Sequence, residues 1–139
     1  MRKVFRLAIA LLVVVLLPLH AFAELTPPIV SPFYNYTGAI SAELSISGGK
    51  ADCGGFIRPD NGYTASIRVV LYRSSDGKSW TEIDSWSNSS SSSGTAVSAS
   101  GSKSLSSGYK YKVTAFGTVK NSSGTTVESP TKSTSIKSY

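Results

Sequence analysis

Side chains that commonly perform catalysis or bind metals are scarce in this sequence. Its 139 residues include one histidine, one cysteine and one methionine, and the histidine, His20, belongs to an N-terminal segment that we expect to be removed. Without that segment no histidine remains, which excludes Ser-His-Asp and Cys-His catalysis and histidine-based zinc sites. The single cysteine, Cys53, excludes an intramolecular disulfide and a thiolate metal cluster. We therefore expect no cofactor, no bound metal and no enzymatic activity.

The first 23 residues have the features of a signal peptide. The basic residues come first: Arg2, Lys3 and Arg6. Residues 7–17 are all apolar, and residues 21–23 read Ala-Phe-Ala, a small-x-small pattern that signal peptidase accepts. The apolar stretch is shorter than the roughly 20 residues that span a bilayer, so we expect cleavage before Glu24 and not retention as an anchor. The sequence predicts a secreted protein, extracellular or associated with the cell envelope, with no membrane attachment after cleavage.

Charge restricts the class of partner. The chain has 14 Lys and Arg residues against 8 Asp and Glu, a formal charge of +6. Three of the basic residues precede Glu24, which leaves 11 against 8, a charge of +3 for the exported part. The remaining basic residues are dispersed along the chain and do not form a cluster, so we expect no nucleic-acid partner.

The remaining sequence is rich in Ser, Thr and Gly and alternates between apolar and polar residues, as β-strands do. The alternation predicts strands at residues 40–47, 51–57, 63–72, 80–87, around 97–99, at 109–117 and near 125–136, the last interrupted by Pro130. We expect Ile67, Val69 and Leu71 to anchor the core and Cys53 to be a small buried residue. About seven strands, spaced by about ten residues and with no helical segment, predict an all-β antiparallel sandwich of the immunoglobulin class. It would comprise residues 38–139, after an extended leader at 24–37 whose aromatic side chains dock on the domain edge.

Two segments resemble known families. Residues 105–113, Leu-Ser-Ser-Gly-Tyr-Lys-Tyr-Lys-Val, are similar to the L-x-P-G-x-x-Y-x-V signature of fibronectin type III domains, with Ser107 where that family usually has Pro. The resemblance implies a fibronectin III-like fold in which Tyr111 forms a tyrosine corner, its hydroxyl bonding to the backbone upstream, with Leu105 and Gly108 as structural residues. It implies no function. The whole chain, through residues 46–53 above all, also resembles small secreted proteins of Gram-positive bacteria with no assigned activity, in which a signal peptide precedes one strand-rich domain.

The predicted strand at 80–87 contains the candidate site. In a regular strand Trp80, Glu82, Asp84 and Trp86 share one side, and because two buried carboxylates would each cost several kcal/mol, we expect that side to face solvent. Neighbouring strands contribute further residues to the same face: Arg68, Tyr72, Lys110, Lys112 and Phe116. The alternative is a bulge that turns one tryptophan into the core, with Lys and Arg stems covering the other and pairing with the two acids.

Aromatic side chains beside charged groups are typical of surfaces that recognise glycans or proteins. We therefore expect a secreted, non-catalytic binding module with a cell-wall glycan or a protein surface as its partner. Two alternatives remain open: a structural envelope-associated domain without a specific ligand, and a small carbohydrate-active hydrolase that uses Glu82 and Asp84, the only close acidic pair.

Overall fold

The computed structural model describes residues 33–139, which form nine β-strands and no helix. The predicted signal peptide, the proposed cleavage point and residues 24–32 of the predicted leader lie outside the described residues. A search of the described part of the chain for a long apolar helix able to cross a membrane finds none.

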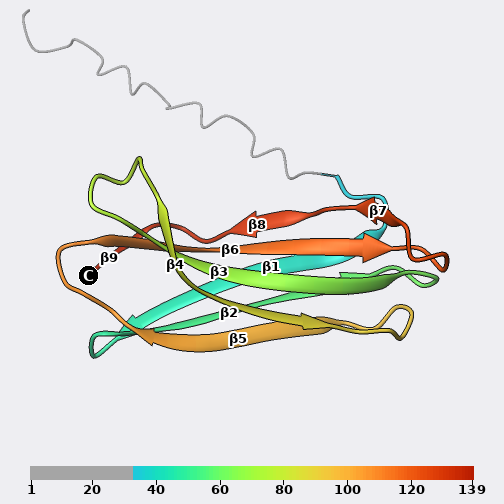
Figure 1. Cartoon of the computed structure of the whole chain (residues 1–139), viewed down its shortest axis with the longest axis horizontal. Helices are drawn as coiled ribbons and strands as arrows, with labels where there is room; N and C mark the ends of the chain where they lie inside the picture. Colours follow the sequence, from blue (N-terminus) through green and yellow to red (C-terminus); the bar gives the residue numbers. More distant parts are fainter. Residues whose placement is uncertain (1–32) are drawn as a thin grey trace, which may run out of the picture. The chain divides into compact units, whose positions relative to one another are not determined.

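The strands form two antiparallel sheets (Figure 1). The three-stranded sheet has the order β1-β2-β5, with β1 at Thr37–Ser47, β2 at Lys50–Pro59 and β5 at Val97–Ser104. In the six-stranded sheet the order is β4-β3-β6-β7, and β8 and β9 also pair with β6. Its strands are β3 (Thr64–Ser74), β4 (Thr81–Ser89), β6 (Lys110–Lys120), β7 (Thr126–Glu128), β8 (Thr131–Ser133) and β9 (Lys137–Ser138). The all-β antiparallel prediction is confirmed, with the last predicted strand, near 125–136, divided into β7 and β8 and followed by β9.

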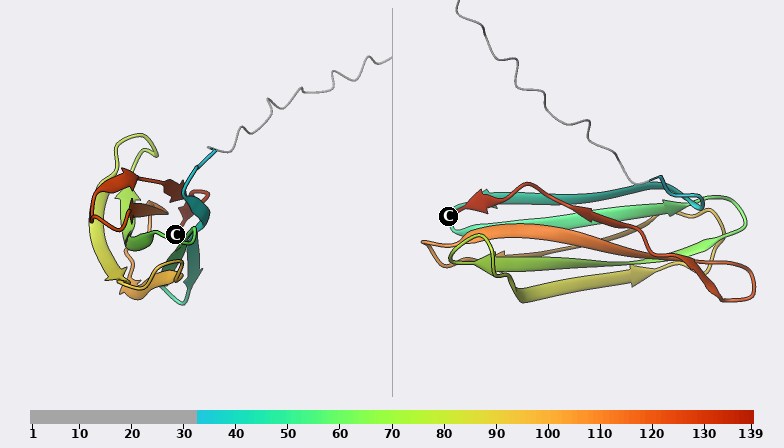
Figure 2. Two further views of the ribbon diagram at one scale, coloured as in Figure 1. Left: turned by 90° about the vertical axis from the view of Figure 1, so that its right-hand side faces the viewer. Right: turned by 90° about the horizontal axis from the view of Figure 1, so that it is seen from above.

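A single apolar core lies between the sheets, and in the end-on view of Figure 2 the strands surround it. Ile67, Val69 and Leu71 of β3 are at most 2% exposed, as predicted. Burying a large aliphatic side chain contributes roughly 1.5 to 3 kcal/mol, so these residues supply much of the stability. A Cβ at Gly55 on β2 would lie 3.1 Å from Cγ2 of Val69, so this glycine lets the two sheets approach closely.

The turns follow the glycine signals of the sequence. Gly48 and Gly49, with φ of 56° and 76°, connect β1 to β2 as a two-residue hairpin loop, in which positive φ matches the twist of the strands.

Two strands end differently from the prediction. β4 extends to Ser89, two residues beyond the strand predicted at 80–87. Pro130 separates β7 from β8, is fully buried, and accepts a hydrogen bond from the N–H of Gly117 at 2.8 Å.

The residues that lead into β1 are attached to the six-stranded sheet. The carboxylate of Glu128 on β7 accepts hydrogen bonds from the N–H groups of Asn35 (2.7 Å) and Tyr36 (3.2 Å) and from the Thr37 hydroxyl (2.5 Å). The Tyr34 hydroxyl accepts from the N–H of Thr131 at 3.0 Å and donates to its carbonyl at 3.1 Å. Tyr34 and Tyr36 therefore dock on the domain, as predicted for the aromatic residues of the leader, whereas Phe33 is 93% exposed and does not.

The hydrogen bond predicted for Tyr111 is present. Its side chain is fully buried, and its hydroxyl donates to the carbonyl of Ser106 at 2.6 Å and accepts from the Ser106 N–H at 3.2 Å. Leu105 packs against the core, and Gly108, with φ of 82°, adopts a conformation that favours glycine in the turn before β6. These contacts fix the loop between β5 and β6.

Candidate binding surface

A β-bulge in β4 decides which of its side chains face solvent. Opposite β3, Asp84 pairs with Leu71 and Glu82 pairs with Tyr72, so Ile83 is an extra residue on β4. The bulge breaks the alternation along the strand. The regular arrangement, with both tryptophans and both acids on one side, is therefore wrong, and the strand has the bulged arrangement that the sequence left as the alternative.

Trp86 lies on the inner side of β4, where it closes one edge of the sandwich. It pairs with the core residue Val69 and packs against the core cluster. Its indole occupies the space above Gly101 of β5, where a Cβ would overlap the ring. Trp86 therefore bridges the two sheets, and the prediction that it belongs to the exposed surface is corrected.

Asp84 belongs to the same edge. Its Oδ2 lies 3.2 Å from Nζ of Lys103 on β5, and its Oδ1 accepts a hydrogen bond from the Ser85 N–H at 2.9 Å. Four residues further along β4, the Asn88 side-chain amide donates a hydrogen bond to the carbonyl of Ser98 on β5 at 2.8 Å. Asp84 thus joins two strand edges and is not on the outer face, which corrects its predicted place beside Glu82.

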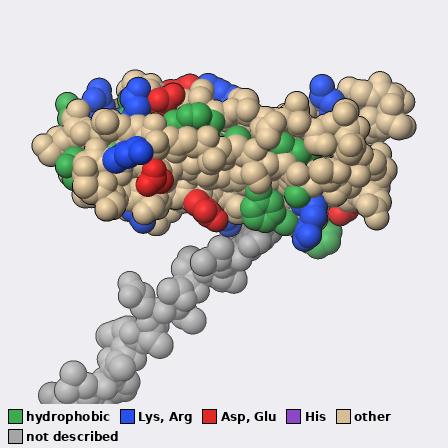
Figure 3. All heavy atoms as spheres, turned by 90° about the horizontal axis from the view of Figure 1, so that it is seen from below, with side chains coloured by type: hydrophobic (Ala, Val, Ile, Leu, Met, Phe, Trp, Pro, Cys, Tyr) green, Lys and Arg blue, Asp and Glu red, His purple; other side chains and the backbone are tan. Residues whose placement is uncertain are grey.

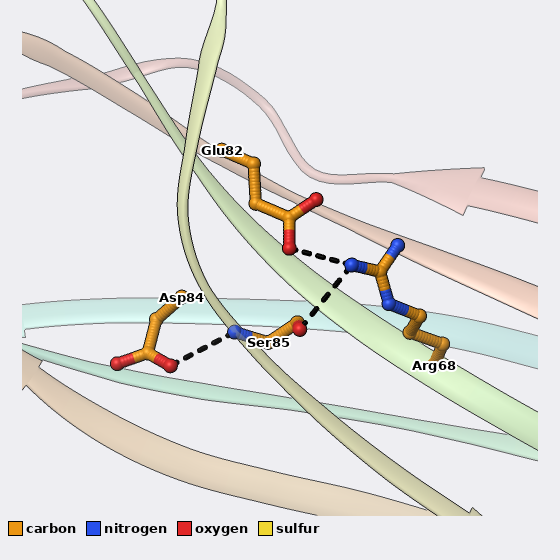
Figure 4. Close-up of polar contacts among 4 residues, drawn as sticks. All are labelled: Arg68, Glu82, Asp84 and Ser85. Carbon is orange, nitrogen blue, oxygen red and sulfur yellow. Dashed lines mark hydrogen bonds and ion pairs between the residues drawn. The ribbon is translucent and has the colours of Figure 1, made fainter.

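Glu82 and Arg68 form an ion pair on the outer face of the six-stranded sheet (Figure 4). Nη2 of Arg68 lies 2.5 Å from Oε1 of Glu82 and donates a second hydrogen bond to the Ser85 hydroxyl at 3.3 Å. Figure 4 shows Glu82 and Asp84 pointing in opposite directions from β4. The two carboxylates therefore do not share a site.

Three more predicted residues gather on this outer face. Nζ of Lys112 on β6 lies 4.4 Å from the ring centroid of Trp80 and 5.8 Å from that of Tyr72. The ammonium group of Lys112 is thus held against two aromatic rings by cation-π attraction. We call Trp80, Tyr72, Lys112, Glu82 and Arg68 the outer cluster.

An open hollow of about 560 Å³ adjoins the outer cluster. Arg68 belongs to both, and the residue opposite it on β6 is Phe116, whose side chain is 37% exposed at the edge of the hollow. Most other lining residues carry a hydroxyl or an amide: Ser66, Ser87, Asn88, Ser89 and Thr118. The hollow therefore offers the exposed ring of Phe116 surrounded by hydrogen-bonding groups. Through Arg68 this surface continues into the outer cluster, where Lys112 lies against the rings of Trp80 and Tyr72.

Hydrophobic side chains form small patches on the face drawn in Figure 3. Most of that face belongs to backbone and to side chains that are neither hydrophobic nor charged. Such a surface matches the richness of the sequence in Ser, Thr and Gly. A large apolar docking patch is not visible on that face.

Among the described residues, two ionisable groups have clearly perturbed pKa values. Burial, followed by the negative charges of Asp52 and Asp84, raises the pKa of the Cys53 thiol to about 11. The thiol therefore stays protonated at neutral pH and is a poor nucleophile, as expected for a small buried residue.

Hydrogen bonds from the N–H groups of Lys78 and Ser79 lower the pKa of Asp76 to about 2, which marks it as a turn residue. Within residues 33–139, no group of three or more His, Cys, Asp or Glu is arranged to hold a metal ion.

Sequence reasoning missed the partners on β5. Lys103 and Gly101 lie on the strand that the sequence indicates only by Val97 and Ala99, and nothing in the sequence pairs them with β4. The available signal was Gly101 itself, because a glycine inside a strand indicates a close approach by another group.

Comparison with known proteins gives little further guidance. No protein-family model matches the chain, and no curated protein matches it. Among solved structures, the chain is similar to the crystal structure of Spo0M, a sporulation control protein from Bacillus subtilis, with a TM-score of 0.44 and 10% sequence identity. The match covers 73% of this chain and 48% of that one, so the chain spans about half the length of Spo0M. A likeness this weak carries no functional argument.

Proposed function

We propose that this protein is a secreted, non-catalytic binding module that uses the outer face of β4, β3 and β6 to hold a cell-surface glycan. The observation that carries the proposal is the continuity between the outer cluster and the hollow. Arg68 belongs to both, so aromatic rings, charged groups and hydroxyls occupy one uninterrupted surface.

A fibronectin III-like fold fits this role. The two packed antiparallel sheets, β1-β2-β5 and β4-β3-β6-β7, support this assignment, because sandwiches of this class are built from two such sheets. The buried hydroxyl of Tyr111, bonded to the backbone of Ser106 upstream, supports the same assignment. Side chains on the strands of such a sandwich are held more precisely than side chains on loops.

The chemistry of the outer face suits a sugar. A pyranose ring has an apolar face that packs on an aromatic ring, and its hydroxyls exchange hydrogen bonds with short polar side chains. Phe116 supplies an exposed ring, and Ser66 and Thr118 lie beside it along the neighbouring positions of β3 and β6. A compact aromatic anchor surrounded by polar groups is the usual composition of a recognition surface.

Hydrolysis is disfavoured by the same geometry. A glycosidase needs two carboxyl groups that flank one bond. Glu82 is paired with Arg68 on the outer face, whereas Asp84 is paired with Lys103 at the edge facing β5. The close acidic pair of the sequence is thus divided between two environments, which supports a binding role over catalysis.

The proposal is tested with two phenylalanines of equal exposure. Phe116 on the outer face of the six-stranded sheet is 37% exposed, and Phe56 on the outer face of the three-stranded sheet is 36% exposed. We expect Phe116→Ala to reduce the fraction of protein retained on insoluble cell-wall polysaccharide at least about fivefold, equivalent to about 1 kcal/mol. Phe56→Ala should be retained like the wild type.

Equal retention of both variants would contradict the proposal. It would instead favour the structural alternative, an envelope-associated domain without a specific ligand. Matching circular dichroism spectra and melting temperatures would show that neither substitution acts through unfolding.

A further inference from the structure

The bulge in β4 changes the charge of the outer face. Without it, Glu82 and Asp84 would both lie on this face, but Asp84 is turned away and paired with Lys103. β3 and β6 contain no acidic residue. Glu82 is therefore the only carboxylate that the three strands present on this face, and Arg68 neutralises it.

Two lysines on β6 remain without an acidic partner. Lys110 and Lys112 pair with Ser74 and Tyr72 of β3, on the outer side of the sheet. Among the described residues, the ion pairs within 4 Å are Arg68 with Glu82 and Lys103 with Asp84, and neither involves these lysines. The outer face therefore carries an excess of positive charge beside its aromatic rings.

The side chains of both lysines lie against neighbouring residues. Lys112 lies against the rings of Trp80 and Tyr72. Lys110 lies across the turn before β4, because a Cβ at Gly77 would be 3.0 Å from its Nζ. Residues two apart on a strand are separated by about 6.6 Å, so the two lysine positions form a short row of positive charge along β6.

We propose that the ligand of the outer face is an acidic polysaccharide, a glycan chain that bears carboxylate groups. This rests on the proposed function, and it adds that Lys110, Lys112 and the free N–H groups of Arg68 contact the carboxylates, while Phe116 packs on a sugar ring. Charge complementarity selects this ligand over a neutral glycan. It is also preferred over a single-stranded nucleic acid, whose successive bases stack on several aromatic rings, because Lys112 covers the ring of Trp80 and leaves Phe116 as the exposed ring of this face.

The experiment compares two polymers with the same sugar backbone, one with charged carboxylates and one with neutral methyl esters. The probes are polygalacturonate and the same polymer after full methyl esterification, and binding of the exported chain is measured by affinity electrophoresis. We expect the acidic polymer to bind at least about tenfold more tightly at low ionic strength. The preference should disappear near 0.5 M NaCl, where the Debye length falls to roughly 4 Å and ion pairs at the surface are screened.

A matched pair of double variants locates the effect. Lys110→Gln/Lys112→Gln removes two positive charges from the outer face, and Lys50→Gln/Arg58→Gln removes two from β2, on the exposed side of the three-stranded sheet. The first should weaken binding to polygalacturonate about tenfold and leave binding to the esterified polymer within about twofold. The second should change neither. Melting temperatures serve as the folding control.

Each contrary result has a definite meaning. Equal binding of the two polymers, with loss in Phe116→Ala, would overturn the acidic ligand and leave the binding function standing. Equal weakening by both double variants would show non-specific attraction and would also overturn it. The same holds if single-stranded DNA or polyphosphate binds as tightly as polygalacturonate, or if neither form of the polymer binds.

Discussion

The two sides of β4 present the same residue types in different roles. On the inner side, Trp86 and Asp84 join β4 to β5 through an indole over Gly101 and an ion pair. On the outer side, Glu82 and Trp80, which directly precedes the strand, lie in the cluster with Lys112 and Arg68. The extra residue, Ile83, separates the two pairs. The lesson is that a tryptophan and a carboxylate acquire their roles from the pairing of the strand and not from their spacing in the sequence.

The two tryptophans give the largest expected difference in stability. Trp86→Ala should lower the free energy of unfolding by about 2 to 4 kcal/mol, because it leaves a cavity above Gly101 and opens the edge. Trp80→Ala should cost less than about 1 kcal/mol, because it removes only surface packing with Lys112. Urea unfolding curves measure both values. Equal losses would show that the two sides of β4 do not differ in this way.

The interior beside this edge is tested by the reactivity of Cys53. A pKa of about 11 instead of 9.0 lowers the thiolate fraction at pH 8 about 100-fold, and burial slows the reaction further. Ellman's reagent should therefore label native Cys53 at least about 100-fold more slowly than an exposed cysteine on β4, built as Ser87→Cys in a Cys53→Ala background. Comparable rates would mean that the edge opens readily.

The same pKa predicts how stability depends on pH. The thiol is protonated in the folded chain up to a higher pH than in the unfolded chain, so the folded state is favoured below pH 9 and loses this advantage as the pH rises toward 11. The decline in melting temperature between these values should be steeper for the wild type than for Cys53→Ala. Identical slopes would rule out a contribution from Cys53.

A smaller difference is expected between two tyrosines. Tyr111→Phe should lower stability by roughly 1 kcal/mol or more, because it breaks the buried hydrogen bonds with Ser106. Tyr72, on the outer side of β3, has a half-buried ring and should tolerate Phe within about 0.5 kcal/mol. Thermal unfolding of the two variants is the measurement, and an unchanged melting temperature for Tyr111→Phe would argue against a tyrosine corner.

The two acids should differ least in stability. The ion pairs of Asp84 and Glu82 are both partly exposed, so Asp84→Asn and Glu82→Gln should each cost no more than about 1 kcal/mol. They should differ in binding, since Glu82→Gln frees Arg68 and should strengthen attachment to polygalacturonate, whereas Asp84→Asn should not. Affinity electrophoresis of the two variants decides this, and a similar gain for Asp84→Asn would contradict the division of β4 into two sides.

Alternation along the chain was enough to predict most of the strands and the anchors of the core on β3. Ile67, Val69 and Leu71 are buried as predicted. Successive side chains of a strand point to opposite faces, so the alternation within β3 is enough to identify its buried face without knowing which strands lie beside it. The bulge at Ile83 depends instead on how β4 pairs with Leu71 and Tyr72 of β3. The sequence of either strand by itself does not determine this pairing. The sequence consequently predicted which residue types form the candidate site but placed Trp86 and Asp84 on the wrong side.

The attachment of residues 34–37 to β7 and β8 has a mechanical consequence. One carboxylate, that of Glu128, holds three donors of this segment, and Tyr34 is bonded at both its donor and acceptor positions to Thr131. Tension applied through residue 33 would therefore be shared between the two sheets and would not fall on the β1–β2 hairpin alone. We expect Glu128→Gln to lower markedly the force needed to pull β1 out of its sheet in a single-molecule experiment. The same substitution should lower the melting temperature only slightly.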